Sequence, residues 1–263
     1  MTNMSYSPDD TLVFSIAEDR AGVTVSLAGE LDLLSLPDVG MALELAGARG
    51  TPVALDCGRL RFADAAALHF LRRARDRARS AGGDLTLTNT QGIVLRLLEL
   101  TGSLSLAAGS RLPTEPVRVT PSRTAVLQAA VATAVQLAGT PRANLQLADP
   151  AVRRLRIAAQ QGFRPPFLKF FDVVDDSSSA CGAALHTGAS VWVTDVARSP
   201  IYTRAAAQVM LDAGAAAVAS VPVRAPDGEL IAIISAHDET PRAWEDVTRL
   251  QLERLATVTG RLL

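Results

Sequence analysis

The sequence predicts two domains, an α/β domain followed by an α+β domain whose antiparallel sheet is flanked by helices. The chain has 263 residues, which is enough for two ordinary domains. Short β-rich runs alternate with segments of helical periodicity until about residue 106, which predicts a sheet with helices packed on it. A segment rich in glycine and proline follows, and then a helix, several strands, a hairpin and a closing helix. We therefore predict domains at 1–110 and 121–263, joined by a linker at 111–120.

The first domain is expected to open with a β-hairpin formed by residues 11–17 and 23–28. A helix should follow from Ser35, which pairs with Asp38 in an arrangement like a capping box. Pro37 falls in the first turn of this helix, where its missing N–H costs nothing.

The centre of this domain is predicted to be a strand, a tight loop and a helix. The apolar run 52–57 is β-rich and short, as a buried strand should be. Asp64 is suited to cap the helix at 64–81, because its carboxylate can accept the N–H groups of the first turn. Gly82 and Gly83 end that helix. The remaining elements are a strand at 84–89 and a helix at 91–100.

The second domain is expected to start with a helix that Thr120 caps and that places Pro121 at its first position. This apolar helix either covers the sheet or pairs with its copy in a dimer. Residues 226–228 form the turn of a late hairpin. The expected strands are 143–148, 154–160, 190–194, 216–223 and 230–237, and the closing helix is 244–262.

Three motifs of the first domain resemble the STAS fold of bacterial anti-sigma factor antagonists. They are Gly29-Glu30-Leu31-Asp32, Val53-Ala54-Leu55-Asp56 and Phe62-Ala63-Asp64, the last of them followed by a helix. The resemblance implies a docking surface for an anti-sigma factor, or for another regulator with a similar kinase-like fold. It also implies a loop of sequence Asp-Ser-Ser-Gly, in which the partner kinase phosphorylates one serine.

This chain departs from that pattern, because alanines replace both serines. A phosphoserine adds roughly 1.5 to 2 negative charges to the docking surface and can dissociate the partner. Alanine accepts no phosphoryl group, so the domain stays binding-competent, answers to another input, or serves only as a folding and assembly unit. The residues expected to contact a partner are Asp32, Ser35, Asp64, Ala65, Ala66 and Ala67.

The second domain resembles a GAF domain in four motifs. These are Ile157-Ala158-Ala159-Gln160-Gln161-Gly162-Phe163, Cys181-Gly182-Ala183-Ala184-Leu185, Val193-Thr194-Asp195-Val196 and Ser220-Val221-Pro222-Val223. The resemblance implies a small molecule, a chromophore or an ordinary core between the sheet and the crossover helices. The expected lining of such a ligand site is Phe167, Phe170, Phe171, Cys181, Trp192 and Tyr202.

Enzymatic chemistry has little support in the sequence. Cys181 follows a run of serines. If that run is the N-terminus of a helix, it would favour the thiolate form of Cys181; the competing interpretation is a small buried thiol. One GAF class reduces free methionine sulfoxide through several cysteines, and this domain has one. The histidines His69, His186 and His237 lie in no ligand cluster, and no catalytic triad or phosphate-binding loop occurs. We expect no enzyme, no metal and no cofactor.

Charge and cysteine content limit the possible partners and the compartment of the protein. A net charge of −1 and a pI near 6.3 argue against nucleic acid or a membrane surface as partner. Cys57 and Cys181 fall in different domains, which fits a reducing compartment, and no signal peptide or membrane-length run occurs. We expect a cytoplasmic regulator whose GAF domain senses a small molecule and alters what the STAS domain binds. The alternatives are a ligand-free dimeric scaffold built from 122–137 and 244–262, and a thiol redox enzyme.

Overall fold

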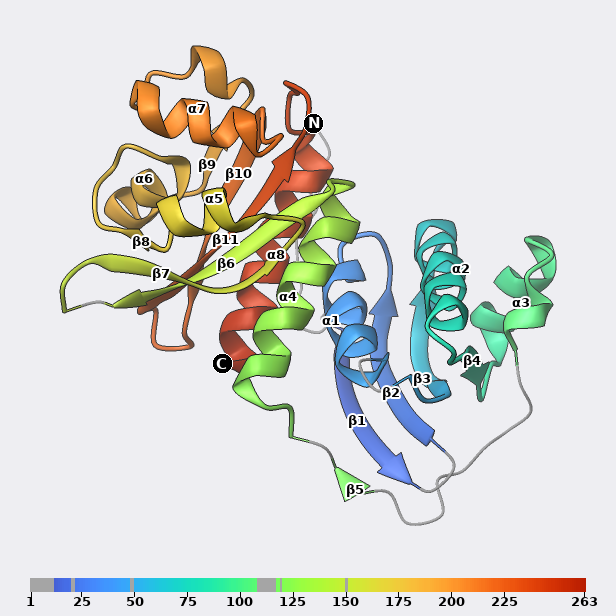
Figure 1. The fold of residues 1–263 in the computed structure, drawn as a ribbon. Helices are drawn as coiled ribbons and strands as arrows, with labels where there is room; N and C mark the ends of the chain where they lie inside the picture. Colours follow the sequence, from blue (N-terminus) through green and yellow to red (C-terminus); the bar gives the residue numbers. More distant parts are fainter. Residues whose placement is uncertain (1–11, 20–21, 48–49, 108–116, 119, 150) are drawn as a thin grey trace, which may run out of the picture. The chain divides into compact units, whose positions relative to one another are not determined.

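The computed structural model describes residues 12–19, 22–47, 50–107, 117–118, 120–149 and 151–263. The chain divides into two compact units, 1–121 and 122–263, whose elements are drawn in Figure 1. The first unit is α/β and the second is α+β, so the predicted fold class is confirmed.

The first unit contains a five-stranded sheet in the order β4-β3-β2-β1-β5. Strands β1 and β2 form the predicted antiparallel hairpin, whereas β3 and β4 continue the sheet in parallel. Helices α1 and α2 connect the parallel strands, because parallel neighbours need a long crossover and a helix usually provides it. The elements are β1 (Val13–Asp19), β2 (Gly22–Leu31), α1 (Leu36–Gly47), β3 (Val53–Ala63), α2 (Ala65–Ser80), β4 (Leu85–Thr88), α3 (Gly92–Leu100), η2 (Leu104–Leu106) and β5 (Val117–Arg118).

Two segments of this unit differ from the prediction. The expected tight loop before Asp64 is instead the second half of β3, which pairs in parallel with β2 as far as Ala63 and Leu31. Register shifts interrupt that pairing, which is why the segment lacks a clean alternating pattern. In the expected linker, residues 111–116 and 119 lie outside the described part of the chain, and Val117–Arg118 form β5, which pairs with β1.

The second unit contains a six-stranded antiparallel sheet in the order β8-β7-β6-β11-β10-β9. Helices α4 and α8 pack on one face of this sheet and on each other, and α5, α6 and α7 cover the opposite face (Figure 1). The elements are α4 (Arg123–Ala138), β6 (Arg142–Asp149), β7 (Arg154–Gln161), α5 (Pro165–Phe170), β8 (Val173–Val174), α6 (Ala180–Thr187), β9 (Val191–Val193), η3 (Val196–Arg198), α7 (Arg204–Asp212), β10 (Ala217–Arg224), β11 (Leu230–Asp238) and α8 (Asp246–Leu262).

The two helices on the outer face begin later than predicted. Ser122, not Thr120, caps α4, because its hydroxyl accepts a hydrogen bond from Ala125 N at 3.2 Å. Helix α8 starts at Asp246, and Trp244 precedes it as a buried residue whose Nε1 donates to Val193 O at 3.1 Å. Gly260 of α8 packs against the backbone carbonyl of Arg224 in β10. A Cβ at this position would clash with that carbonyl, so the close packing requires glycine.

Candidate functional site

Asp64 connects the loop between β2 and α1 to the start of α2. Its Oδ1 accepts a hydrogen bond from Ala67 N at 2.7 Å, which confirms Asp64 as the cap of α2. Its Oδ2 accepts from Leu33 N at 3.2 Å, in the loop between β2 and α1. One carboxylate therefore fixes the start of α2 and the neighbouring loop relative to each other.

The loop between β2 and α1 is held by its own polar groups. Asp32 Oδ1 accepts from Leu34 N at 3.0 Å and from Ser35 N at 2.9 Å. The Ser35 hydroxyl accepts from Asp32 N at 2.8 Å and donates to Asp32 O at 3.0 Å. Because side chains satisfy these backbone groups, the loop has a defined shape without belonging to a helix or strand.

Three apolar side chains of this loop and of β3 are exposed. Leu33 and Leu34 are each 38 % exposed and Phe62 is 42 % exposed, which sequence reasoning did not anticipate. Ala65 is exposed and Ala66 half-buried, whereas Ser35 and Ala67 are buried. The last two therefore support the loops and do not offer their side chains to a partner. We call the set Asp32, Leu33, Leu34, Phe62, Asp64, Ala65 and Ala66 the Asp64 surface.

A small cavity lies in the second unit between the sheet and helices α5 to α7. Its volume is about 10 Å³, enough for about one water molecule. Four of the predicted lining residues border it, namely Phe167, Phe171, Cys181 and Tyr202. Polar residues that the sequence analysis did not assign to the lining also border it: Asn144, Gln146, Ser179, Ser220, Ser235 and His237.

The sheet side of this cavity is a polar floor made by three neighbouring strands. Ser220 Oγ and Ser235 Oγ lie 2.8 Å apart, and His237 Nε2 lies 2.8 Å from Asn144 Oδ1. Gln146 Nε2 donates to Phe171 O at 3.2 Å. Gln146 Oε1 and His237 Nδ1 have no hydrogen-bond partner among the described atoms, although both residues are almost completely buried. A buried polar atom left without a partner costs about 1–3 kcal/mol.

Burial also fixes the charge of the floor. It lowers the pKa of His237 to about 3, with a smaller contribution from the positive charge of Arg142, so the imidazole is neutral near pH 7. Because Asn144 Oδ1 accepts from Nε2, the unpaired Nδ1 carries a lone pair and acts as an acceptor. Gln146 Oε1 is an acceptor as well. The floor therefore presents two acceptors that lack donors.

Two expected lining residues do not border the cavity, and the thiolate interpretation of Cys181 is not supported. Phe170 is 44 % exposed and does not border the cavity. Trp192 lies beside Trp244, with 6.4 Å between ring centroids, and the Arg249 guanidinium lies over it at 5.3 Å. Cys181 does follow a helix cap, Ser179, but burial raises the pKa of its thiol, so the helix start does not produce a thiolate.

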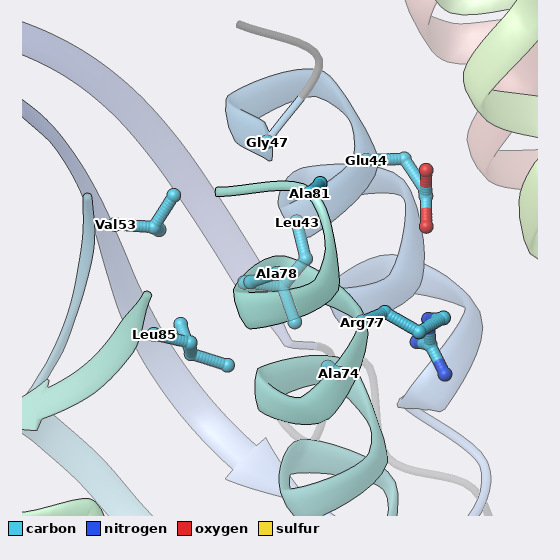
Figure 2. A pocket seen from close by; sticks show the side chains of 9 residues that line it. All are labelled: Leu43, Glu44, Gly47, Val53, Ala74, Arg77, Ala78, Ala81 and Leu85. Carbon is cyan, nitrogen blue, oxygen red and sulfur yellow. The ribbon is translucent and has the colours of Figure 1, made fainter. Parts of the chain in front are cut away.

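An open pocket of about 220 Å³ lies between α1 and α2 of the first unit (Figure 2). Its walls are mostly apolar, and the side chains of Glu44 and Arg77 project on the same side of it. Burial lowers the pKa of Arg77, which stacks over Phe70 at 5.9 Å. The lining residues are Leu43, Glu44, Gly47, Val53, Ala74, Arg77, Ala78, Ala81 and Leu85.

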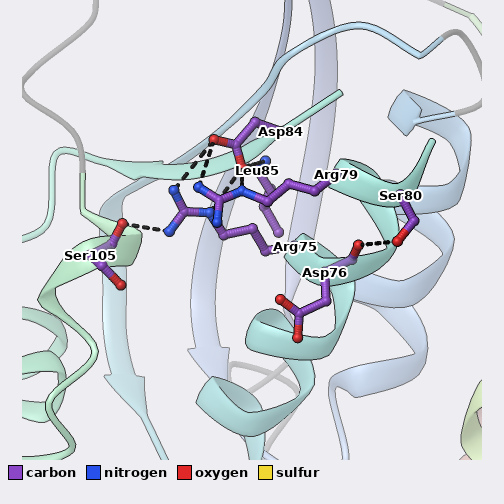
Figure 3. A network of polar contacts seen from close by, with 7 residues as sticks. All are labelled: Arg75, Asp76, Arg79, Ser80, Asp84, Leu85 and Ser105. Carbon is purple, nitrogen blue, oxygen red and sulfur yellow. Dashed lines mark hydrogen bonds and ion pairs between the residues drawn. The ribbon is translucent and has the colours of Figure 1, made fainter. Parts of the chain in front are cut away.

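A charged network fastens α2 to the segment that follows it (Figure 3). Arg75 Nε and Arg79 Nε lie 2.9 and 3.1 Å from Asp84 Oδ1, and Arg75 also donates to Ser105 O. The hydrogen bond from Arg75 is the largest cause that holds the pKa of Asp84 at about 2. Arg75 is therefore largely buried in this network, whereas Arg79 stays about half exposed.

Replacing Asp84 with asparagine should lower the free energy of unfolding by about 1–2 kcal/mol, because charge-assisted bonds to two arginines are lost at a partly exposed site. Urea unfolding at pH 7 measures this. Glu99→Gln is the matched control, since its ion pair with Arg96 is exposed and spans 3.3 Å; its cost should stay below about 0.5 kcal/mol. Equal losses in the two variants would contradict a structural role for Asp84.

Comparison with protein families confirms both resemblances. Residues 14–105 match the family described as Mlab, STAS domain, and residues 122–263 match the GAF domain family. The chain belongs to the GAF domain family and carries a STAS domain before it. Together the two domains fit a bacterial signalling or regulatory protein.

Solved structures are similar to about half of this chain. A free methionine-R-sulfoxide reductase from Neisseria meningitidis is 22% identical, covers 54% of this chain and 77% of its own, and has a TM-score of 0.44. The GAF domain of an Acinetobacter phosphoenolpyruvate-protein phosphotransferase is 12% identical, covers 54% and 81%, and has a TM-score of 0.45. No curated protein matches the chain.

Two negative findings apply to the part of the chain that the structure describes. Within it, no helix combines the length and apolar character needed to cross a membrane. The same residues contain no group of three or more His, Cys, Asp or Glu side chains placed to hold a metal ion.

Proposed function

We propose that this chain is a cytoplasmic, non-enzymatic signalling regulator of the anti-sigma factor antagonist type. Its STAS domain binds an anti-sigma factor, or a related regulator, through the Asp64 surface without needing dephosphorylation. Its GAF domain holds a small molecule that alters this binding. The single observation that carries the proposal is the Asp64 surface itself: one carboxylate fixes the loop between β2 and α1 to the start of α2, with exposed apolar side chains and alanines where hydroxyls would be phosphorylated.

The chemistry of the Asp64 surface supports protein binding in two ways. Leu33, Leu34 and Phe62 each expose apolar area, and burying such area in a complex is favourable. The carboxylate oxygens of Asp64 already accept backbone N–H groups, so this residue shapes the surface more than it offers a charge. The nearby Ser35 hydroxyl is buried and bonded to Asp32, which leaves it unsuited to replace the missing phosphorylation site.

A capture experiment with an anti-sigma regulator of kinase-like fold tests the docking proposal. The wild type should retain the regulator, and Leu33→Asp should reduce its affinity at least about tenfold, because a charge replaces a buried apolar contact. Leu100→Asp is the control, since Leu100 is 70 % exposed on α3, outside the Asp64 surface; this variant should bind as the wild type does.

A separate variant tests the effect of the missing serine hydroxyl. Ala66→Ser restores a phosphorylatable side chain in the first turn of α2. In the presence of ATP, the regulator should phosphorylate and release this variant and should stay bound to the wild type. If neither form retains an anti-sigma regulator, the antagonist proposal is wrong. Phosphate found on the wild-type STAS domain would equally contradict it.

The small size of the cavity favours a second candidate, a scaffold whose GAF domain holds no ligand. This scaffold would be dimeric and built on α4 and α8. Both helices already pack on the sheet of their own chain, so only their remaining exposed sides would meet a copy. Sedimentation of the full chain separates the two candidates: a dimer that dissociates on Leu250→Asp, at a residue 53 % exposed on α8, would support the scaffold.

A further inference from the structure

A wide cleft lies next to the polar cavity of the second unit. Its volume is about 610 Å³, and α5, α7 and the adjoining loops line it, with Arg142, Val209, Gly214 and Phe167 among the contributing residues. Phe167 is the residue that borders both the cleft and the cavity. The ring of Phe167 therefore lies between the wide cleft and the smaller cavity.

The Phe167 ring is held by contacts with neighbouring rings, and rotation of the side chain would break them. It stacks on Phe163 with 3.7 Å between ring centroids. It lies nearly perpendicular to the His237 ring, with 5.8 Å between the two ring centroids. Helix α5, which carries it, has only six residues. The open cleft beside it offers room for the displaced ring, whereas the cavity with the ring in place admits about one water molecule.

The floor behind Phe167 selects for hydrogen-bond donors. Gln146 Oε1 and His237 Nδ1 both lack a donor and are almost completely buried. The residues that line the cavity include no Asp, Glu, Lys or Arg, so nothing there compensates an ionised ligand. An anion would also meet two acceptor lone pairs. Two other aromatic residues line the cavity, Phe171 and Tyr202, and they favour a flat ring packed against them.

We propose that Phe167 is a gate, and that the ligand of the GAF domain is a neutral planar ring that carries N–H donors for Gln146 Oε1 and His237 Nδ1. The ligand enters from the cleft and takes the place of the Phe167 ring, which turns outward. This inference rests on the proposed ligand-holding role of the GAF domain. It is independent of what the STAS domain binds.

Aniline and toluene form a matched pair of probes for this gate. They have nearly the same shape, and only aniline carries N–H donors; it is neutral near pH 7. Titration calorimetry of the full-length Phe167→Ala variant should show aniline binding about tenfold more tightly than toluene, as one hydrogen bond to a buried acceptor provides. Adding Gln146→Leu should weaken aniline binding, because one of the two acceptors is lost, and should leave toluene binding unchanged. Phe170→Ala, on the same helix but exposed, should bind neither probe.

Each other outcome overturns the inference. Equal binding of aniline and toluene to Phe167→Ala would mean that the floor does not select donors. Absence of binding to Phe167→Ala, and to the milder Phe167→Leu if the alanine variant unfolds, would mean that Phe167 is not the gate. A crystal of Phe167→Ala grown with aniline that shows only a water on Gln146 and His237 would do the same. Failure to capture an anti-sigma regulator, with aniline bound as expected, would reject the docking proposal and leave the gate standing.

Discussion

The His237→Gln variant is expected to lose most of the acid sensitivity of the second unit. In the folded wild type His237 has a pKa of about 3, whereas in the unfolded chain its pKa is near the ordinary 6.5. Below pH 6.5 the unfolded state therefore binds a proton that the folded state does not. The sign follows directly: the free energy of unfolding is unaffected above pH 6.5 and falls as the pH drops from 6.5 toward 3. The slope for one such group is about 1.4 kcal/mol per pH unit.

Urea unfolding between pH 7.5 and pH 4.5 measures this slope. Glutamine keeps a donor for Asn144 but does not titrate, so the variant should have a flatter curve than the wild type even if it is less stable at pH 7. His69→Gln, at an exposed position of α2, should leave the wild-type slope unchanged. Asp84 does not interfere, because its contribution is complete above pH 3.8 and is lost as the pH falls toward about 2. Parallel curves for wild type and His237→Gln would show that His237 is hydrated in the folded state.

Local sequence was sufficient for the parts of the fold that depend on near neighbours. The β1–β2 hairpin follows from two β-rich runs with turn residues between them, and the Asp64 cap follows from a carboxylate placed just before a helical pattern. The end of β3 was missed because its pairing with β2 contains register shifts, which remove the alternation by which a strand is recognised. Ser122 was missed as a cap because the competing Thr120-Pro121 pair carries the same local signal.

The polar floor depends on pairing between distant strands, which no local pattern contains. Ser235 faces Asn144 on β6 and Ser220 on β10, so three residues far apart in the sequence form one row. A signal was nevertheless present: Asn144 and Gln146 alternate within an apolar strand, and so do Ser235 and His237, which indicates one buried face that is polar. The same alternation explains Trp192. Its neighbours Val191 and Val193 pack in the inner core, so Trp192 points to the other face.

Replacing Asp64 with alanine should have the second large effect, a loss of about 2–4 kcal/mol in the free energy of unfolding of the STAS domain. The loss combines a helix cap, worth about 1 kcal/mol, with a charge-assisted hydrogen bond to Leu33 N, worth about 1.5–3 kcal/mol. Asp64→Asn retains an acceptor for the cap and should lose less than half as much. Asp76→Ala, at an exposed position on the same helix, is the control and should change stability by less than about 0.5 kcal/mol.

Hydrogen exchange distinguishes a local role of Asp64 from a global one. If this carboxylate fixes the loop between β2 and α1 to the start of α2, Asp64→Ala should speed exchange at Leu33 N and Ala67 N more than at the amides of β2. The Asp64 surface would then lose its fixed shape, and partner binding should weaken even though the apolar side chains Leu33, Leu34 and Phe62 remain. Uniform acceleration across the domain would instead mean that Asp64 supports only overall stability, and that the loop between β2 and α1 keeps its position against α2 without it.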